Sequence, residues 1–240
     1  MSCDTKNKIA IFMTNISDYE YYREFKDIKN YQNVDWYYFT DKNIESTFWK
    51  IYNINKLDAI IGKNIDSRLL TKHIKMNTHK ILPDYDYYLY IDASFEINNL
   101  NLIDDINNFI KNDFNLVLFI HPRQKERNTH KEYKRCRETF KKYVIKFDEQ
   151  ITFYREEKFN INKKDSLYAT GIIFKKNIDK INNMMELWFE QNKKYSTRDQ
   201  ISLPYVLWKS NIEPSKVIHQ HIFNNILVGI YIRKERPLDV

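Results

Sequence analysis

The sequence predicts an α/β domain in which a mixed, mostly parallel sheet is flanked by helices. Two observations lead to this fold class. Short apolar runs typical of buried strands alternate with amphipathic, helix-like segments along the whole chain. The 240 residues also suffice for one large α/β domain or two small ones. No internal repeat, low-complexity tract or convincing linker divides the chain, so we expect a single domain over residues 1–240.

The expected strands are short runs of apolar and aromatic residues. The first of them, KIAIFM, ends at Thr14 and Asn15, and a later one, YYLYI, ends at Asp92. Ligands bind at the carboxyl ends of strands in open α/β sheets, so these polar residues are the first places to look for a site. We expect strands over residues 8–13, 34–39, 48–54, 87–91, 114–120, 166–174 and 216–219.

The expected helices are segments with apolar residues on one face. Residues 68–82 form such a segment, with Ser67 as a plausible cap and Pro83 as a stop. Residues 177–192 form another, in which Met185 and Trp188 lie on the apolar face. The remaining helices are expected over residues 102–110, 128–142, 148–158 and 197–209, with partial helix over residues 17–29.

The charge balance suits an anionic ligand. There are 39 basic and 32 acidic residues, a net charge of +7 and a pI near 9.1. Asn, Lys, Ile and Tyr are over-used and share AT-rich codons, which explains part of this basic character by genome composition. The chain lacks both a dense Lys/Arg cluster and the signatures of RNA-recognition, KH and helix-turn-helix domains. We therefore expect no nucleic-acid partner.

Glycine is scarce, and this excludes two common phosphate-binding motifs. The three glycines are Gly62, Gly171 and Gly229. Neither a GxGxxG fingerprint nor a Walker A loop can be built from them. If the protein binds a phosphorylated nucleotide, a metal ion, basic side chains or a helix N-terminus must hold the phosphates.

Cysteine content and hydropathy bear on location. The two cysteines, Cys3 and Cys136, form neither a disulfide framework nor a CxxC pair. The first eight residues lack the apolar core of a signal peptide, and no run approaches 18 apolar residues. We expect a cytoplasmic protein without a membrane span, and the oligomeric state does not follow from the sequence.

The segment YYLYIDASFEI is the strongest local feature. An aromatic strand delivers Asp92 at its carboxyl end, and Ser94 follows two residues later. This is the spacing of a DxD motif, in which carboxylates bind a divalent cation that in turn binds a diphosphate. The motif is degenerate because the second position is Ser94. An aspartate at a strand end is also a common turn former, so both interpretations stay open.

A helix with a basic stripe leads into that strand. Arg68, Lys72, Lys75 and His79 are spaced four, three and four residues apart, so they share one helix face. A solvated basic face is the ordinary interpretation of such a stripe. The functional interpretation is a set of cations directed at phosphate, because the stripe is adjacent in sequence to the Asp92 strand.

The segment STRDQISLPYVLW provides a second carboxylate. Thr197 and Gln200 have the spacing of a capping box, and Asp199 then lies in the first helical turn, where a carboxylate complements the helix dipole. This accounts for Asp199 structurally. The functional alternative is a general base or a transition-state stabiliser near a sugar. Pro204 is awkward inside this helix, which predicts a later start or a kink.

Two histidine-containing segments are weaker candidates. In HPRQKERNTHKE, His121 ends a strand and Arg123 follows in a polar stretch that is either a ligand contact or solvated surface. In HQH, the imidazoles of His219 and His221 face one side of an extended segment. A zinc pair would need a third ligand. A single late histidine that completes a Mn²⁺ site with Asp92, or an ordinary polar strand end, are the alternatives.

Taken in order, these motifs resemble a family of glycosyltransferase-like proteins with a GT-A fold. Its best-known members are plant proteins of mucilage and pectic polysaccharides, and it also occurs in bacteria and viruses. The resemblance runs from about residue 9 to residue 209. Its most specific parts are RLLTKHIKMNTHKILPDYDYYLYIDASFEI and TRDQISLPYVLW, and VDWYYFTD, WKI and HPR…E occur in the expected order between and around them.

The resemblance implies a GT-A domain that uses a nucleotide-sugar donor, with a UDP-sugar favoured, and Mn²⁺ or Mg²⁺. The donor-binding residues that we predict are Thr14, Asn15, Arg68, Lys72, Lys75, Asp92, Ala93, Ser94, His121 and Arg123. The catalytic residues are Arg198, Asp199 and Gln200. The metal ligands are Asp92 and Ser94, with His219 and His221 as candidates for a late histidine. Glu132 matches the last position of the HPR…E element.

Together, residues and resemblance predict a metal-assisted glycosyltransferase that moves a sugar to a hydroxyl group of a glycan or glycoconjugate acceptor. The alternative is a catalytically inactive GT-A-fold module that binds a nucleotide sugar or a glycan, because Ser94 replaces the second carboxylate of the metal motif. The donor sugar, the acceptor and the stereochemical outcome do not follow from the sequence.

Overall fold

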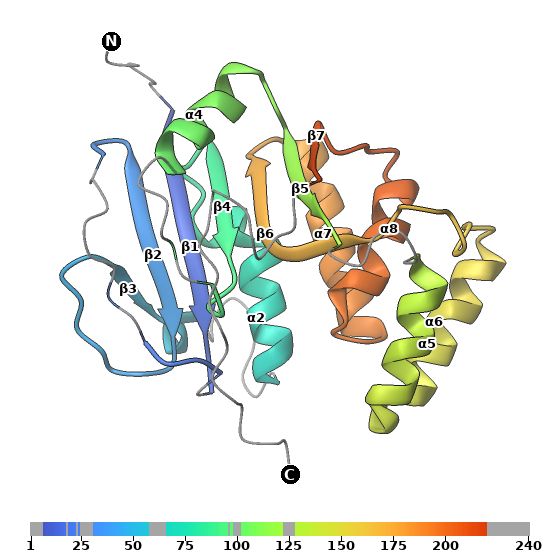
Figure 1. Cartoon of the computed structure of the whole chain (residues 1–240). Coiled ribbons are helices and arrows are strands. Elements are labelled where there is room, and N and C mark those ends of the chain that lie inside the picture. The colour runs from blue at the N-terminus through green and yellow to red at the C-terminus, as the bar shows by residue number, and fades with distance from the viewer. Residues whose placement is uncertain are drawn as a thin grey trace.

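A seven-stranded sheet forms the centre of the molecule (Figure 1). The strand order is β3-β2-β1-β4-β6-β5-β7, and β6 is antiparallel to both of its neighbours while the other pairings are parallel. The strands are β1 (Ile9–Asn15), β2 (Val34–Thr40), β3 (Lys50–Asn53), β4 (Tyr87–Ile91), β5 (Leu116–Ile120), β6 (Tyr168–Lys176) and β7 (Lys216–Ile218). The computed structural model describes residues 7–17, 19–22, 24, 31–57, 66–95, 97, 102–121 and 128–219.

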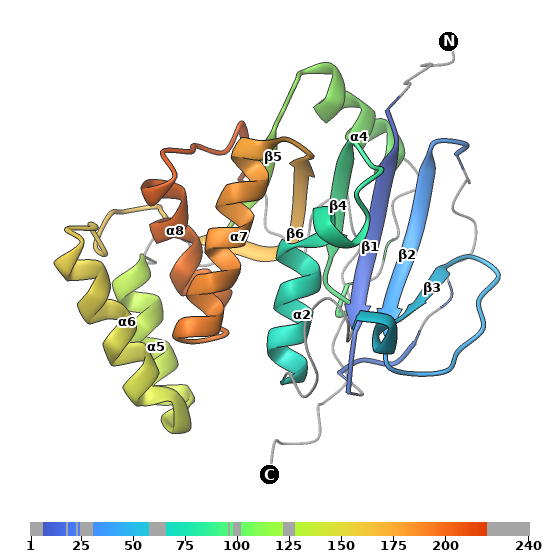
Figure 2. The same ribbon diagram turned by 180° about the vertical axis from the view of Figure 1, so that it is seen from behind.

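Helices cover both faces of the sheet. Figure 1 shows α4 in front of the sheet, and the reverse view in Figure 2 shows α2, α7 and α8 on the opposite face, with α5 and α6 beyond α8. The helices are η1 (Ile54–Leu57), α2 (Ser67–Met76), α3 (Thr78–Ile81), α4 (Leu102–Lys111), α5 (Thr129–Thr139), η3 (Lys141–Tyr143), α6 (Val144–Glu156), α7 (Asp179–Lys194) and α8 (Asp199–Lys209). Within the part of the chain that is described, none of these helices is long and apolar enough to cross a membrane.

One apolar core lies on each side of the sheet, because alternate residues of a strand point to opposite faces. In β1, Ile9 and Ile11 belong to the core under α4, whereas Ala10 and Phe12 belong to the core under α2, α7 and α8. Every residue of β1 is buried. The sheet therefore has no solvated face at its centre, as is usual for parallel sheets covered by helices.

The predicted strands are confirmed, with shifted ends, and β4 has the predicted bounds. The third strand is shorter than predicted, because β3 ends at Asn53 and the chain continues as η1. Most of residues 17–29, where we expected partial helix, lie outside the described residues. The prediction of one domain over residues 1–240 stays a prediction.

The helix predicted over residues 68–82 is wrong in its continuity and in its cap. The side chain of Asp66, not Ser67, accepts hydrogen bonds from the backbone of Arg68 and Leu69 at 3.0 and 3.2 Å. The helix then breaks at Asn77, whose φ of −100° and ψ of 25° are not helical. Lys75 is therefore in the last turn of α2.

The capping box predicted at Thr197 and Gln200 is also absent. Helix α8 begins at Asp199, and no side chain caps it. Its later start agrees with the expectation raised by Pro204, which lies inside α8. Because proline has no N–H, the helix lacks the hydrogen bond from residue 204 to the carbonyl of Gln200.

The carboxyl ends of β1, β2 and β4 meet at one edge of the sheet because these strands are parallel. We refer to it as the carboxyl edge. Thr14, Asn15 and Thr40 end their strands there, and Asp92 follows β4. In Figure 1 this is the lower edge, toward which the arrowheads of β1 and β2 point. The fold thus gathers the polar strand ends that were expected to form a site.

Candidate functional site

Asp92 forms a tight turn directly after β4. The backbone N–H and the hydroxyl of Ser94 donate hydrogen bonds to Asp92 Oδ1 at 3.0 and 2.8 Å, and Phe95 N–H donates to the Asp92 carbonyl at 2.9 Å. The turn-forming interpretation of Asp92 is therefore correct for Oδ1. Among the described residues, no hydrogen bond engages Oδ2 of Asp92, so the turn leaves one carboxylate oxygen available.

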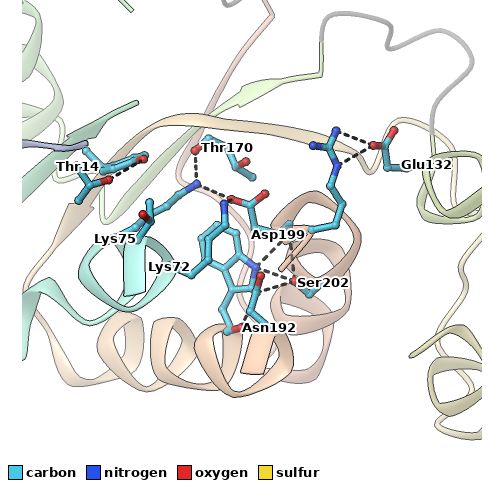
Figure 3. Close-up of polar contacts among 12 residues, drawn as sticks. Thr14, Lys72, Lys75, Glu132, Thr170, Asn192, Asp199 and Ser202 are labelled. Carbon is cyan, nitrogen blue, oxygen red and sulfur yellow. Dashed lines mark hydrogen bonds and ion pairs between the residues drawn. The ribbon is translucent and has the colours of Figure 1, made fainter. Parts of the chain in front are cut away.

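Lys72, Lys75 and Asp199 form a compact ionic cluster, which we call the Lys–Asp–Lys cluster (Figure 3). The two ammonium groups donate to the same carboxylate oxygen, Asp199 Oδ2, at 2.8 Å from Lys72 and 2.7 Å from Lys75. Helix α2 supplies both lysines from one face, and α8 supplies the aspartate at its first residue. Oδ1 of Asp199 has no hydrogen-bond partner among the described residues.

The cluster lies next to Asp92, and strand β6 connects the two. The carbonyl of Thr170 accepts a hydrogen bond from Lys75 Nζ at 2.5 Å, and the carbonyl of the next residue, Gly171, accepts one from Asp92 N–H at 2.7 Å. The register of β6 against β5 shifts at this point, between Leu118 and Phe119. Such an irregularity re-aims backbone groups, and here it directs two neighbouring carbonyls to the site.

Burial and charge set the protonation of the cluster. Lys75 is 2% exposed, and its amine lies 4.9 Å from the centre of the Tyr90 ring and 5.4 Å from that of Trp188. Burial lowers the pKa of Lys75 to about 8, although Asp199 acts in the opposite direction. Burial alone would raise the pKa of Asp199, but the two lysines outweigh it and hold that pKa far below its usual range.

Side chains of α7 hold the start of α8 in place. Trp188 Nε1 donates to the carbonyl of Asp199 at 3.2 Å and to the hydroxyl of Ser202 at 3.0 Å. Asn192 Nδ2 donates to the same hydroxyl at 3.1 Å. These buried contacts, drawn in Figure 3, orient Asp199 without a side-chain cap. Rigid support of this kind keeps a functional carboxylate in one position.

A second ionic cluster joins α8 to α5. Glu132 is fully buried, and its carboxylate accepts hydrogen bonds from Arg198 Nη2 at 2.9 Å and from Arg135 Nη2 at 2.5 Å. Burial opposes ionisation of Glu132, but the two arginines lower its pKa to about 2. Arg198 precedes Asp199 in the chain. The Glu132 cluster therefore anchors the backbone that leads into the Lys–Asp–Lys cluster.

The ends of β1 and β2 provide the other side of the site. Thr14 lies 3.5 Å from the hydroxyl of Tyr90, measured between the side-chain oxygens. Asn15 Nδ2 donates to the hydroxyl of Tyr38 at 2.8 Å and to the carbonyl of Glu20 at 2.6 Å, and Glu20 N–H donates back to Asn15 Oδ1. Asn15 thus folds the loop after β1 toward the carboxyl edge.

The structure brings some of the remaining predicted residues to the carboxyl edge and leaves others away from it. Gln200 is the second residue of α8, and its buried Oε1 has no hydrogen-bond partner within the described part of the chain. Arg68, one turn before Lys72, is exposed and donates to the hydroxyl of Tyr143 at 3.4 Å. Ala93 is buried in the turn between Asp92 and Ser94. The basic stripe therefore divides among different partners, because Lys75 points inward and Arg68 outward.

Of the two predicted histidine ligands, only His219 lies within the described residues, and it is far from Asp92. His219 follows β7, which is three strands away from β4, a separation of roughly 14 Å at about 4.8 Å per strand. His121 follows β5, where its N–H donates to the carbonyl of Leu167 at 3.0 Å. Arg123 and His221 lie outside the described residues. Within the described ranges, no group of three or more His, Cys, Asp or Glu could hold a metal ion.

Two contributors to the site were not predicted. The sequence pattern places Trp188 on the apolar face of its helix, yet its indole N–H donates a hydrogen bond to the carbonyl of Asp199 at the start of α8. The carbonyl of Thr170 holds Lys75, and a carbonyl leaves no trace in a sequence. Gly171 was the available signal, because a lone glycine within a strand pattern indicates an irregularity or a close backbone approach.

Comparison with known proteins identifies the family. The sequence profile of the TOD1/MUCI70 glycosyltransferase-like domain matches residues 18–230. No curated protein matches the sequence significantly. Among solved structures, mouse xyloside xylosyltransferase 1 is similar with a TM-score of 0.48 and 8% identity, over 89% of this chain and 85% of that one.

Two further solved structures are similar at a lower level. A glycosyltransferase involved in the glycosylation of the major capsid of PBCV-1 gives a TM-score of 0.40 and 10% identity, over 90% of this chain and 82% of that one. Core-mannan synthase A from Aspergillus fumigatus, in its Mn/GDP form, gives a TM-score of 0.40 and 12% identity, over 86% of this chain and 71% of that one.

Among the described strands, the sheet order with β6 as the one reversed strand, together with the polar carboxyl edge, defines a GT-A-type α/β fold. The profile match covers most of the chain. This protein belongs to the TOD1/MUCI70 glycosyltransferase-like domain family.

Proposed function

We propose that this protein is a metal-dependent glycosyltransferase that transfers a sugar from a UDP-sugar to a hydroxyl group of a glycan or glycoconjugate acceptor. Family membership supports the reaction class. One observation carries the proposal further: Asp92 and Asp199 lie close together at the carboxyl edge, and each keeps one carboxylate oxygen free of hydrogen bonds within the described residues. Strand-end carboxylates at this edge of an α/β sheet are where a ligand is expected.

Asp92 is the residue that fits a divalent cation. Its Oδ2 is a hard oxygen ligand, of the kind that Mn²⁺ and Mg²⁺ prefer. Ser94 is the second predicted ligand in this turn, and the donor diphosphate would supply further oxygen ligands. When bound, the ion would act as a Lewis acid that neutralises charge on the departing UDP.

Asp199 serves as a fixed negative charge in this proposal. A carboxylate whose pKa is held so low by two lysines takes up a proton poorly, which disfavours the role of general base. Its unengaged Oδ1 is suited to stabilise positive charge that develops at the sugar ring during transfer. Fixed carboxylate charge of this kind acts without any rearrangement during the reaction.

The two lysines have different tasks. Lys72 has 19% of its side chain exposed and can reach an anionic phosphate, whereas Lys75 has 2% exposed and remains with Asp199. We therefore assign Lys72 to the diphosphate and Lys75 to positioning of Asp199. Gln200 adds a buried acceptor, Oε1, that has no partner among the described residues and could receive a sugar hydroxyl.

The test combines nucleotide binding with turnover. UDP with Mn²⁺ should raise the thermal stability of the protein, by about 2.7 kcal/mol at 100-fold its dissociation constant, and EDTA or Asp92→Ala should abolish that gain. Asp199→Asn should keep UDP-dependent stabilisation relative to its own baseline but lose transfer and donor hydrolysis. Asp113→Asn, which changes a carboxylate that is 77% exposed, should keep both. A protein that no nucleotide stabilises, with or without metal, would contradict the proposal.

A catalytically inactive GT-A-fold module that binds a nucleotide sugar or a glycan is the second candidate. The observation that favours it is the turn at Asp92, in which Ser94 provides a hydroxyl where a second carboxylate would strengthen a cation site. Donor hydrolysis separates the two candidates. Slow release of the sugar from a UDP-sugar, lost in Asp199→Asn, supports the enzyme, whereas UDP binding without any hydrolysis supports the binding module.

A further inference from the structure

A cavity of about 290 Å³ lies at the opposite end of the sheet from Asp92 and Asp199. Its walls include Asp35 and Tyr37 of β2 and the segment before β4 that contains Pro83 and Tyr85. Strand β4 separates this cavity from Asp92 by roughly 17 Å, at about 3.3 Å per residue. The cavity is therefore separate from the proposed donor site.

The cavity exists because neighbouring elements stop short of it. Strand β3 pairs with β2 only from Tyr37 onward, so Asp35, two residues earlier in β2, has no β3 residue beside it in the sheet. In Figure 2, α2, α7 and α8 all lie on the side of β1 that is away from β2. The end of α3 at Ile81 and the following residue, Leu82, also line the cavity.

A directed chain of hydrogen bonds frames the cavity. Asp35 accepts from the hydroxyl of Tyr85 and from Lys50 Nζ, the latter at 2.6 Å. Because Tyr85 uses its proton on Asp35, Tyr37 donates to Tyr85 across the 2.8 Å between the two hydroxyl oxygens. The lone pairs of the Tyr37 hydroxyl then remain available as acceptors. The two rings meet edge to face, with centres 5.9 Å apart and an angle of 88° between their planes.

The chemistry of the walls is mixed and close to electrically neutral. Lys8 and Asp84 contribute one charge of each sign. The third charged wall residue, Asp35, is paired with Lys50, which does not itself line the cavity. Gln32 contributes an exposed amide, and Pro83 contributes apolar surface. Tyrosine rings with polar tips, an amide and a paired carboxylate present apolar surface and hydrogen-bonding groups side by side. This pattern matches a ligand with apolar C–H faces and a rim of hydroxyl groups.

We propose that this cavity binds one sugar residue of a neutral saccharide, at a site separate from the donor site. The volume of about 290 Å³ lies just below the range of about 300–1,000 Å³ for small-molecule sites, which suits a single sugar ring better than a nucleotide sugar. The balance of charges on the walls favours a neutral sugar over a uronate. A site of this kind would let the protein hold a glycan at a distance from the carboxyl edge.

The binding experiment is a ¹H–¹⁵N NMR titration with glucose, galactose, mannose and xylose, and with galacturonate as the charged comparison. EDTA is present and no nucleotide is added, so binding does not depend on the proposed donor site. We expect saturable shifts at the amides of Asp35, Tyr37 and Tyr85 for at least one neutral sugar, with a dissociation constant of about 1 mM to 10 mM. The same shifts should occur in Asp92→Ala, whatever the outcome for UDP binding.

Two variants locate the site, and a third serves as the control. Tyr85→Phe keeps the ring and removes one hydroxyl, so it should weaken binding about fivefold. Gln32→Ala changes an exposed side chain that cannot affect folding greatly, and it should also weaken binding. Asn183→Ala, on the exposed face of α7, should leave binding unchanged. Shifts confined to residues near Asp92, or no shifts for any sugar up to about 50 mM, would overturn the proposal.

Discussion

The replacement Asp199→Asn tests how much the ion pairs of the Lys–Asp–Lys cluster contribute to the free energy of unfolding. The variant removes the charge that faces Lys75, an amine with 2% exposure that donates to Asp199 at 2.7 Å. Burial has already lowered the pKa of Lys75 from 10.5 to about 8 with Asp199 in place. This lowering of the pKa corresponds to a cost of about 3 kcal/mol for keeping Lys75 charged in the folded protein, at 1.36 kcal/mol per pKa unit. Breaking a buried ion pair from one side costs about 3–5 kcal/mol, and we expect the lower end because asparagine keeps one acceptor oxygen.

The penalty should depend on pH in a defined direction. In wild type, Lys75 carries its charge in the folded state below a pH of about 8, so the ion pair that the variant lacks stabilises wild type mainly below that pH. Raising the pH from about 6 to about 9 should therefore shrink the difference between variant and wild type. For wild-type Lys75 the folded pKa lies below the unfolded one. The unfolded chain then binds more protons between about pH 8 and 10.5, and this group makes the free energy of unfolding rise with pH there.

The assay is urea unfolding followed by circular dichroism for wild type, Lys75→Met, Asp199→Asn and the double variant. We expect a coupling energy of about 2–3 kcal/mol, because the double variant leaves no unpaired charge at Lys75. Lys146 and Glu149 provide the matched control, since both side chains are about half exposed, at 51% and 49%. Their cycle should give less than about 1 kcal/mol. A coupling at Asp199 no larger than this control would refute the reasoning.

Three further predictions concern buried groups outside the Lys–Asp–Lys cluster. Glu132→Gln should make the free energy of unfolding fall less steeply in acid. The folded pKa of Glu132 is about 2, below the usual 4.5, so its contribution of up to about 3 kcal/mol is lost as the pH falls from about 4.5 toward 2. Urea unfolding at about pH 5 and pH 3 measures this loss. Burial lowers the pKa of Lys175 to about 7. Lys175→Met should therefore raise the free energy of unfolding at pH 7 by about 1–2 kcal/mol and remove the increase in that free energy between about pH 7 and 10.5. A variant that is less stable than wild type at pH 7 would contradict this. Burial raises the pKa of Cys136 to about 12. In a Cys3→Ser variant, a thiol reagent should therefore label Cys136 only as fast as the protein unfolds. Rapid labelling of the native protein would contradict the burial of Cys136.

The strand pattern could be predicted because its causes are local. The apolar runs that became β1, β4 and β5 are buried on both faces, so each needs little context to be recognised as a strand. The position of Asp92 follows from the same reasoning, since it comes directly after β4. Its turn was also foreseen, because an aspartate accepts hydrogen bonds from the backbone two residues later.

Tertiary contacts decided what the local patterns could not. The spacing of Lys72 and Lys75 predicts one helix face but not its direction, and a solvated face was the ordinary interpretation. In the fold, α2 packs against the sheet with α7 and α8 beside it, so the face carrying Lys75 turns toward Asp199. Lys75 and Asp199 are 124 positions apart in the sequence, so no local pattern can predict this contact.

The sequence by itself determined the alternation of strands and helices, the absence of a glycine-rich phosphate loop, and the position of Asp92 at a strand end. These properties depend on residue type and spacing along a few turns or strand repeats. The tertiary structure alone decided that Asp199 pairs with two lysines, that it stays ionised, and that a cavity opens at the far end of β2. Protonation and cavity shape depend on burial and on the charges that distant segments bring together, and neither is encoded at a single point of the chain.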